Sequence, residues 1–586
     1  MAVTSASTKN QPRTFPAKNS PDATAVGNSS LALRTWAWLQ TTLGLGLLGS
    51  LLMYLAQPPC KWWLLAWIAP VPWLLLCRQA KLVGRRPYRA LWLAGFVFWL
   101  GAIHWLRLPH WITYFGWLAL SFYLAFYVPV FVGLVRVAVQ RLGISIVVAA
   151  PVVWTGLELA RGHLLSGFTM GALSHTQVHW LAFIQIADVI GDYGTSGLVM
   201  LVAACIARTI PWRRQRFTLW PIAPLPLVLA GAVVYGSWRT AGVITRPGPT
   251  VALIQGSIDV EVKTDEKQLN AVLAEYLRLS KQALQEQPNL DLLVWPETMY
   301  PNPLYTFAPG FQPPTKWENT PEEMSQWSLK NLHDMQEYFH GIVEDKFNAP
   351  LPPPLLIGID AAHYSNEGSE HSQSDYFNSA LFVDSQGNPL ARYDKMHPVM
   401  FGEYIPLAEY LPFLYKITPL TGGLTSGTKA VSQKLGDFRY APNICYETVV
   451  PHLIRRQVWQ LRAQGEEPDV LVNITNDGWF RGSSELDMHL ACGVFRAVEM
   501  RKPLLIAANT GFSAWIDSDG RIVQQGPRRA AEVIIAQPEL DSRRSFYLDH
   551  GDLIPGLCLA GCLGLAAVGL WDWRSRRRGK PDMAMN

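Results

Sequence analysis

Charged side chains are scarce in this chain of 586 residues. Asp, Glu, Lys and Arg make up 16% of it, against roughly 25% in an ordinary soluble domain, while hydrophobic residues reach 49%. The shortage falls almost entirely on the first 240 residues and on a stretch near the C-terminus. We therefore expect membrane segments attached to one soluble block.

Paired cysteines and a basic surface patch are also missing. The 7 cysteines show no CxxC spacing, and only Cys445 and Cys492 fall in the soluble block. This pattern argues against a disulfide framework or a zinc site, and we expect no metal and no cofactor. The net charge is only +5, and the bases lie beside apolar stretches, so we expect no nucleic-acid partner.

Long apolar runs fill the N-terminal part of the chain. Residues 1–34 lack apolar periodicity, and we predict a disordered extension there. Eight apolar runs follow, at 36–56, 62–77, 90–106, 115–138, 144–160, 195–210, 220–237 and 553–571. A helix needs about 20 apolar residues to cross the hydrocarbon core, so 62–77 and 195–210 could instead be buried or re-entrant helices.

Basic clusters predict how these runs are oriented. Lys and Arg gather at 78–89, at 213–216 and at 574–580. If every run spans, these three clusters fall on the same side, which the positive-inside rule makes cytoplasmic. Residues 240–550 are then outside the cytoplasm.

The outer block reads as one α/β domain. Seven β-rich runs recur, at 250–255, 290–295, 354–359, 380–383, 469–474, 503–508 and 532–536, with helical patterns at 267–286 and 484–501. Mixed strands and helices over this length indicate a layered core. Residues 300–353 are rich in Pro, Trp, Glu and Asn, and we predict a long surface insertion there.

Three local sequences place reactive side chains at the ends of predicted strands. They are Leu293–Thr298 with Glu297, Tyr393–Pro406 with Lys395 and Glu403, and Pro442–Glu447 with Cys445, Tyr446 and Glu447. A carboxylate, an ammonium and a thiol at strand ends suit acyl transfer through a thioester.

Each of these groups has a chemical task in such a reaction. Glu297 can take the proton of the Cys445 thiol, and the Lys395 ammonium can lower the thiol pKa and hold a tetrahedral oxyanion. The backbone N–H of Tyr446 is a second candidate oxyanion donor, each such donor being worth about 3–4 kcal/mol. Two further carboxylates, Glu403 and Glu447, can orient the lysine or assist proton transfer.

These motifs resemble the nitrilase (carbon–nitrogen hydrolase) superfamily with its Glu-Lys-Cys triad, and within it the apolipoprotein N-acyltransferases. The sequences ALIQG, WPE, YDKMHPVMFGEYIP, ICYE and NITNDGWF occur in that family's order. So does the arrangement of seven spans, an outer nitrilase-like domain and a final span. The resemblance covers roughly residues 35–575.

The resemblance implies both fold and roles. Glu297 becomes the base, Lys395 the oxyanion stabiliser and Cys445 the nucleophile, with Glu403 and Glu447 as essential second carboxylates and Tyr446 as an oxyanion or positioning residue. The implied reaction is ping-pong. A phospholipid donates an acyl chain to the thiol, and the thioester then acylates the α-amine of the S-diacylglyceryl-cysteine at the N-terminus of an apolipoprotein.

The predicted fold class is a multi-span α-helical membrane domain with an extracytoplasmic α/β nitrilase-like domain, an α-β-β-α sandwich. We expect a monomer in the bacterial inner membrane, multi-pass, with the catalytic domain in the periplasm. The predicted parts are the disordered extension 1–34, a seven-helix domain at 35–240, the catalytic domain at 248–548, an eighth helix at 552–572 and a basic cytoplasmic tail at 573–586.

Some positions depart from the family pattern or remain open. Arg481 stands where the family usually has Gly after Trp-Phe, and Met400 replaces a usual Pro. Cys445 could be a structural thiol, or could pair with Cys492 in a disulfide. The apolar segment 407–420 is either plain core or a lipid-facing arm over the thiol.

Two other functions stay open from the sequence. One is a membrane-tethered amidase or nitrilase, with the same triad and water as the acyl acceptor. The other is a non-catalytic lipoprotein-binding scaffold.

Overall fold

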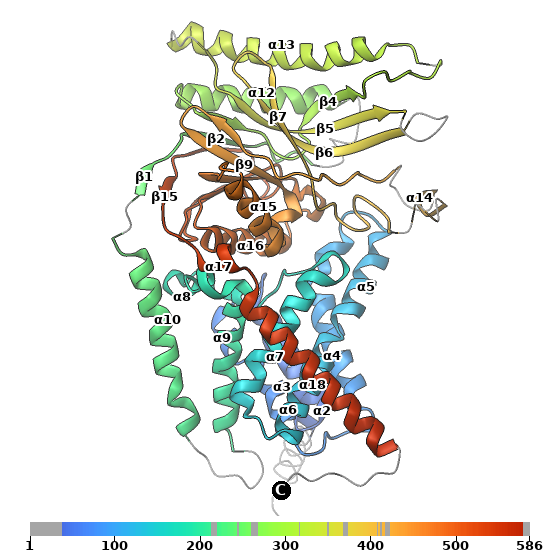
Figure 1. Ribbon diagram of the computed structural model, residues 1–586, viewed down its shortest axis with the longest axis vertical. Helices are drawn as coiled ribbons and strands as arrows, with labels where there is room; N and C mark the ends of the chain where they lie inside the picture. The colour runs from blue at the N-terminus through green and yellow to red at the C-terminus, as the bar shows by residue number, and fades with distance from the viewer. Residues whose placement is uncertain are drawn as a thin grey trace, which may run out of the picture.

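The computed structural model describes residues 38–211, 219–242, 245–259, 268–315, 317–347, 351–366, 373–406, 408, 410, 413–416 and 422–577. The predicted extension 1–34 lies outside these residues, as does most of the segment 407–420. The chain forms a helical bundle with an α/β domain stacked on one end of it (Figure 1).

Each predicted apolar run contains a helix. The long elements of the bundle are α2 (Thr42–Ala56), η1 with α3 (Trp63–Trp67, Val71–Cys77), α4 (Pro87–Ala102), α5 with α6 (Thr113–Leu124, Tyr127–Arg141), α7 (Ile146–His163), α9 (Ala187–Thr209), α10 (Pro224–Thr240) and α18 (Leu553–Arg577). Short helices fill the loops: η2 (His104–Arg107), η3 (Leu164–Ser166), η4 (Ser174–Gln177), α8 (Leu181–Ile184) and η5 (Trp220–Ile222).

Four stretches in the described part of the chain are long and apolar enough to cross a membrane: Thr113–Arg141, Ala187–Thr209, Trp220–Thr240 and Leu553–Arg577. The second of these contains most of the 195–210 run. The 62–77 run is broken near Pro70 and Pro72, because proline lacks an N–H and is tolerated only in a first helical turn.

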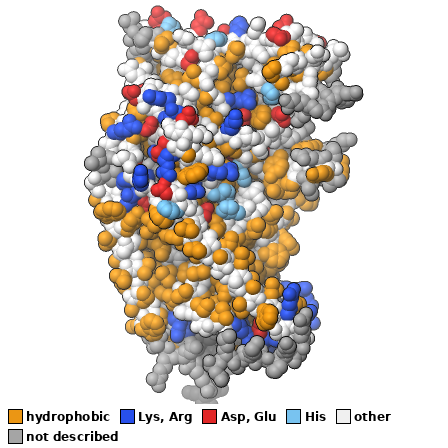
Figure 2. Space-filling view, in the orientation of Figure 1, with side chains coloured by type: hydrophobic (Ala, Val, Ile, Leu, Met, Phe, Trp, Pro, Cys, Tyr) orange, Lys and Arg blue, Asp and Glu red, His pale blue; other side chains and the backbone are white. Residues whose placement is uncertain are grey.

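The two ends of the bundle differ in chemistry. At one end its loops meet the α/β domain: Lys61 pairs with Asp487 at 2.7 Å, and the Trp105 ring contacts Phe480. The other end carries the basic residues, where Arg136 donates to the Leu76 carbonyl at 3.1 Å. Figure 2 shows hydrophobic side chains over the bundle between the charged α/β domain and this basic end. The cluster at 213–216 lies outside the described residues.

Two sheets form the α/β domain. The seven-stranded sheet runs β14-β2-β3-β5-β6-β7, with β4 paired to β5, and the six-stranded sheet runs β13-β12-β11-β10-β9-β8. The first comprises β2 (Val251–Gln255), β3 (Leu292–Val294), β4 (Tyr300–Phe307), β5 (Leu355–Ser365), β6 (Gln373–Val383), β7 (Pro389–Asp394) and β14 (Glu532–Ala536). The second comprises β8 (Gln433–Leu435), β9 (Phe438–Ile444), β10 (Val470–Thr475), β11 (Leu504–Ala508), β12 (Ala514–Ile516) and β13 (Ile522–Gln525). A separate pair joins β1 (Thr245–Pro247) to β15 (Glu539–Asp541).

Alternating side chains build the layers. Val251 and Leu253 of β2 face the second sheet, in a core shared with Val470 and Val472 of β10. Ala252 of β2 faces the opposite way, towards α12 (Leu269–Glu286), because successive strand residues point to opposite faces. With α15 (Pro451–Ala463) and α16 (Glu485–Met500) beneath the second sheet, the predicted α-β-β-α sandwich is confirmed (Figure 1).

The prediction of a surface insertion at 300–353 was wrong for most of its length. Residues 300–307 form β4, which pairs with β5. Residues 321–347 form α13 (Pro321–Phe347), which buries Leu332, Met335, Phe339 and Val343 in the same core as α12. The many polar residues of this helix cover one side only, so their abundance hid a helical apolar stripe.

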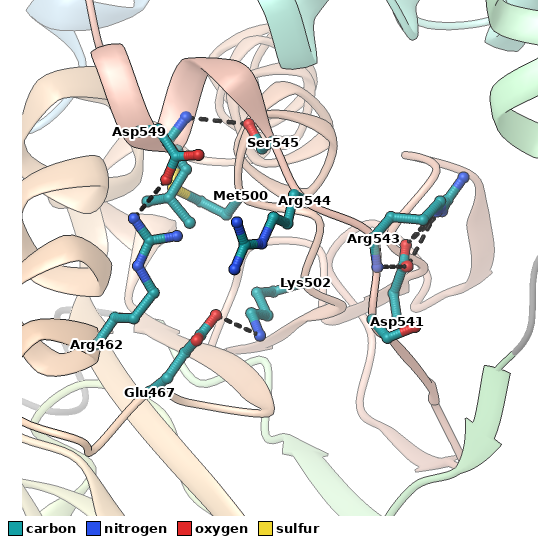
Figure 3. Close-up of a pocket in the computed structure, with 11 residues that line it drawn as sticks. Arg462, Glu467, Met500, Lys502, Asp541, Arg543, Arg544, Ser545 and Asp549 are labelled. Carbon is teal, nitrogen blue, oxygen red and sulfur yellow. Dashed lines mark hydrogen bonds and ion pairs between the residues drawn. The ribbon is translucent and has the colours of Figure 1, made fainter.

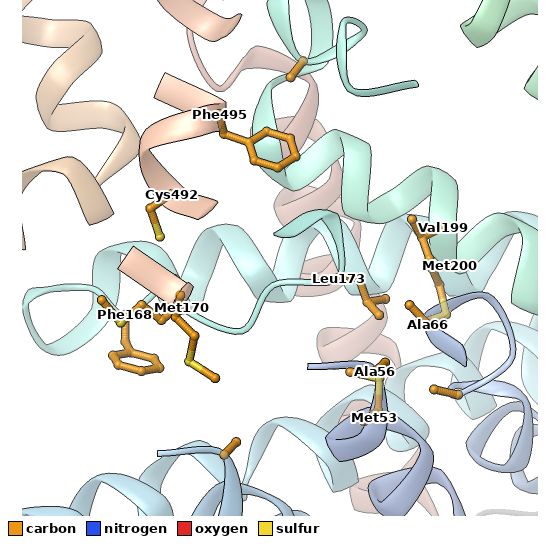
Figure 4. Packing of buried hydrophobic residues seen from close by; sticks show 14 of the residues in the cluster. Met53, Ala56, Ala66, Phe168, Met170, Leu173, Val199, Met200, Cys492 and Phe495 are labelled. Carbon is orange, nitrogen blue, oxygen red and sulfur yellow. The ribbon is translucent and has the colours of Figure 1, made fainter. Parts of the chain in front are cut away.

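The bundle and the α/β domain share one hydrophobic core. It joins Phe168, Met170 and Leu173 of the bundle to Cys492 and Phe495 of α16 (Figure 4). Buried charges reinforce the contact: Arg501, just after α16, pairs with Asp188 of α9 at 2.6 Å, and Asp192 donates its backbone N–H to Glu499 at 2.8 Å. The two parts are therefore fixed to each other by both apolar and ionic contacts.

We expect Arg501→Met to destabilise the protein by about 3–5 kcal/mol, because it leaves the buried carboxylate of Asp188 with one cation fewer. Thermal unfolding of the full chain in detergent measures this. The control is Arg521→Met, whose side chain is 65% exposed and should change stability by about 0.5 kcal/mol or less. Equal unfolding midpoints for the two variants would contradict the ionic role of Arg501.

Candidate active site

The predicted triad gathers at the carboxyl ends of three strands. Glu297 follows β3, Lys395 follows β7, and Cys445 follows β9 of the facing sheet. Stacking the two sheets brings these strand ends together, and the charges of both Glu297 and Lys395 act on the Cys445 thiol. Residues far apart in the sequence thus form one cluster.

Lys395 is buried between two carboxylates. Its side chain is 2% exposed, and its Nζ lies 3.2 Å from Oε1 of Glu297 and 2.7 Å from Oε1 of Glu403. Burial alone would lower the pKa of Lys395, but the two carboxylates raise it well above its ordinary value. The lysine is therefore an ammonium at neutral pH, and Glu403 is the residue that orients it.

Glu297 is held in place by two asparagines, of which Asn378 lies outside the sequence motifs. Asn378 of β6 donates from Nδ2 to Oε1 of Glu297 at 2.7 Å, and the backbone N–H of Asn476 donates to Oε2 at 2.9 Å. Asn378 is 4% exposed. The sequence signal for Asn378 was its place just before the predicted strand 380–383. A buried amide there needs hydrogen-bond partners.

Cys445 occupies a constrained turn. It is the first residue of η7 (Cys445–Val449) and has a φ of +52°, a left-handed backbone conformation that residues other than glycine rarely adopt. Its carbonyl accepts hydrogen bonds from the Thr448 hydroxyl at 3.1 Å and from Asn473 Nδ2 at 3.2 Å. These contacts hold the backbone of the turn and present the thiol to the site.

His489, which is not among the predicted site residues, contacts the turn of Cys445 through a hydrogen bond. Its Nε2 lies 3.2 Å from the Cys445 carbonyl, and its Nδ1 lies 3.2 Å from Oδ1 of Asp477. Burial would lower the pKa of His489, but Asp477 raises it to about 10, so both ring nitrogens donate. One ligand atom from each of Asp477, Glu485 and His489 could meet a metal ion. The contacts of His489 with Asp477 and with the Cys445 carbonyl form a hydrogen-bond chain to the turn of Cys445.

Glu447 joins the loops of the two catalytic strands. Its carboxylate accepts from the Tyr393 hydroxyl at 2.8 Å and from the backbone N–H groups of Ile444 at 2.7 Å, Met396 at 2.7 Å and His397 at 3.0 Å. It thus ties the turn of Cys445 to the segment after Lys395. This geometry makes it a positioning residue.

The Tyr446 side chain reaches the bundle. Its hydroxyl donates to the Gly167 carbonyl at 2.8 Å, beside the contact of His397 with the Ser166 carbonyl at 2.8 Å. The loop after α7 therefore lies directly against the site. All seven cysteines are free, so Cys445 and Cys492 form no disulfide in this structure.

Arg481 adopts φ +50° at the end of η8 (Asp477–Phe480). Glycine reaches this left-handed conformation without strain, which explains why a glycine suits this position.

Alkylation of Cys445 should be slow at neutral pH. Burial raises the pKa of the thiol well above its ordinary value and the charge of Glu297 adds to this, while Lys395 opposes both. A raised pKa leaves little thiolate at pH 7, so the rate with iodoacetamide should rise about tenfold per pH unit up to pH 9. Peptide mass spectrometry follows Cys445 alone. Glu297→Gln removes a negative charge and should accelerate alkylation at pH 7; a wild-type rate that is already constant above pH 7 would contradict the raised pKa.

Two family models match this chain. The model described as the apolipoprotein N-acyltransferase N-terminal domain matches residues 49–205, and that described as carbon-nitrogen hydrolase matches residues 355–547. The apolipoprotein N-acyltransferase of Geobacter metallireducens is 33% identical over 86% of this chain and 90% of its own length. That of Rhodopirellula baltica is 30% identical over 91% of this chain and 98% of its own. Among solved structures, one similar protein is Saccharomyces cerevisiae Nit3, a member of branch 10 of the nitrilase superfamily. The match covers 53% of this chain and 97% of the Nit3 chain at 16% identity, with a TM-score of 0.34.

Proposed function

This chain belongs to the apolipoprotein N-acyltransferase family, and we propose that it acylates lipoproteins by way of a thioester on Cys445, with a phospholipid as the acyl donor. It is an acyltransferase of lipoproteins. The observation that carries the proposed route is the convergence of Glu297 and Lys395 on the thiol.

In the first half-reaction, Glu297 accepts the thiol proton as Sγ of Cys445 attacks the ester carbonyl of the donor. The ammonium of Lys395 stabilises the oxyanion that develops. The intermediate collapses with cleavage of the ester C–O bond. Glu297 returns its proton to the leaving alkoxide, and a lysophospholipid departs.

In the second half-reaction, the α-amine of the diacylglyceryl-cysteine attacks the thioester carbonyl. Glu297 accepts a proton from the amine, and the same oxyanion contact operates. The C–S bond breaks, the thiolate of Cys445 recovers a proton, and the amide product leaves. No step needs a metal or another cofactor.

We also propose the membrane placement. All eight helical runs cross the inner membrane. The basic end of the bundle lies in the cytoplasm and the α/β domain lies in the periplasm. The support is the apolar surface between the charged domain and the basic end (Figure 2). The predicted domain boundaries are kept as part of this proposal, and the last helix, α18, runs from Leu553 to Arg577.

Lipid entry is proposed beside the segment that follows Lys395. Phe401 is 64% exposed, and Tyr410 and Phe413 are also exposed. On the bundle, Trp111 and Phe115 at the start of α5 are exposed as well. Figure 1 places α14 (Phe413–Lys416) and α5 on the same side of the molecule. Apolar side chains there can shelter an acyl chain that moves from the bilayer to the thiol.

The test uses the purified full chain with a phospholipid, followed by a diacylglyceryl lipopeptide. We expect an added acyl mass on the peptide that contains Cys445, and its loss with acylation of the lipopeptide in the second step. Free fatty acid without acylated lipopeptide would favour a membrane-tethered amidase or nitrilase. Neither adduct nor acylated product would favour a lipoprotein-binding scaffold. We propose that the enzyme acts as a monomer.

A further inference from the structure

A cavity lies away from the thiol. Its volume is about 350 Å³, and it lies between the end of α15, the end of α16 and the segment 541–549 (Figure 3). The catalytic triad contributes nothing to its lining. α15 starts at Pro451 near the nucleophile and reaches this cavity at Arg462, so its length separates the two sites by about 17 Å at 1.5 Å per residue.

This cavity lies where the chain enters the bundle. The lining segment continues through α17 (Phe546–His550) into the apolar helix α18, which starts at Leu553. Arg239, at the end of α10, donates to the Arg544 carbonyl at 2.9 Å. Both helices qualify as membrane spans, so with the proposed orientation the cavity lies at the level of the outer-leaflet headgroups.

The charges of the lining leave one cation in excess. Three pairs form within it or at its edge: Arg462 with Asp549 at 2.5 Å, Lys502 with Glu467 at 3.0 Å, and Arg543 with Asp541. The remaining cation is Arg544, and no ion pair among the described residues involves its guanidinium. Figure 3 shows that guanidinium between Arg462 and Lys502, with no interaction drawn to it.

The chemistry of this arrangement suits a phosphate group. A guanidinium donates two parallel hydrogen bonds to two oxygens of a phosphodiester, and flanking cations from Arg462 and Lys502 add a favourable field. The exposed Ser542 in the lining offers a hydroxyl donor. The volume is at the lower end of the range for small-ligand sites, which fits a headgroup and excludes a whole lipid.

We propose that this cavity binds the headgroup of an anionic phospholipid, such as phosphatidylglycerol, through the Arg544 guanidinium. The site is separate from the acyl-donor site and holds the catalytic domain at the membrane surface. The proposal depends on the membrane placement and not on the thioester mechanism.

Photolabelling of the full chain in detergent micelles tests the site. The probe is a phosphatidylglycerol analogue with a photoreactive group near its headgroup, and peptide mapping locates the label. We expect label within 541–549, and about tenfold weaker labelling affinity for Arg544→Gln, since the phosphate then loses a charge-assisted hydrogen bond. Arg278→Gln on α12 is the matched control, because it removes one exposed arginine from the face remote from the bundle.

Competition identifies the ligand. Phosphatidylglycerol should displace the probe, whereas phosphatidylcholine and inorganic phosphate should not. Unchanged labelling in Arg544→Gln, or equal displacement by phosphatidylcholine, overturns the proposal. Displacement by millimolar inorganic phosphate also overturns it, since the ligand is then a soluble phosphate. Thioester formation on Cys445 is measured in the same samples, and its presence or absence reports on the catalytic proposal independently.

Discussion

Cys445→Ala should lower the rate of lipopeptide acylation by about 10⁴-fold or more. The substitution removes the sulfur atom to which the acyl group is attached in the proposed mechanism. The fold should be kept, because Cys445 lies at a turn whose carbonyl contacts come from Thr448, Asn473 and His489 and do not involve the thiol. The measurement combines single-turnover acylation with intact-protein mass after exposure to phospholipid.

Cys492→Ala is the matched control, since Cys492 is the other cysteine of the catalytic domain. It is buried against the bundle at α16 and lies in the core, not in the site. We expect a loss of stability from the smaller side chain and retained acyl transfer. An acyl adduct that persists in Cys445→Ala and disappears in Cys492→Ala would refute the assignment of the nucleophile.

Lys395→Met should lower the acylation rate by about 10³-fold and also destabilise the fold. The rate falls because the oxyanion loses its cation, an effect of about 3–4 kcal/mol in comparable sites. Stability falls because Glu297 and Glu403 then face each other in a buried site without the ammonium between them, at a cost of about 3–5 kcal/mol. Detergent-solubilised protein gives both quantities, by single-turnover kinetics and by thermal unfolding.

A double variant separates the two effects. Lys395→Met with Glu403→Gln removes one buried charge together with the ammonium, so part of the stability should return while the rate stays low. Recovery of the rate with stability would contradict a direct role for Lys395 in the reaction.

The pH dependence of stability offers a further check. The pKa of Lys395 is raised in the folded state, so its stabilisation is complete below the unfolded value of about 10.4. It is lost only as pH rises through the folded value. The contribution of the Lys395 ammonium to stability, measured as the difference between wild type and Lys395→Met, should therefore be constant between pH 6 and pH 9.

The triad could be predicted because its signals are local. Each of Glu297, Lys395 and Cys445 stands at the end of a predicted strand, and the carboxyl ends of strands are where α/β folds assemble their sites. The partners of these residues could not be predicted in the same way. Asn378 and His489 reach the site from a strand and a helix whose approach depends on the packing of both sheets.

The fold was predictable where the periodicity was clear. The apolar runs of the bundle and the strands β2, β10, β11 and β14 lie where the sequence indicated. The helix α13 escaped prediction because only one side of it is apolar and its flanks are rich in proline. The pairing of Arg501 with Asp188 was invisible for another reason: the two residues are distant in sequence, and each taken alone looks like an ordinary surface charge.

The common core of bundle and α/β domain has a consequence for how the protein can be produced and dissected. A secreted fragment of residues 245–550 would expose apolar side chains to water, namely Val449, Ile454, Met488 and Phe495. It would also remove the ion-pair partner of Arg501, which is Asp188. Exposed apolar area of this kind drives aggregation, so the excised fragment should not remain a soluble enzyme. The α/β domain must then fold after, or together with, insertion of the helices into the lipid. Neither part can be replaced by that of a relative unless the interface between α9 and α16 is redesigned as well.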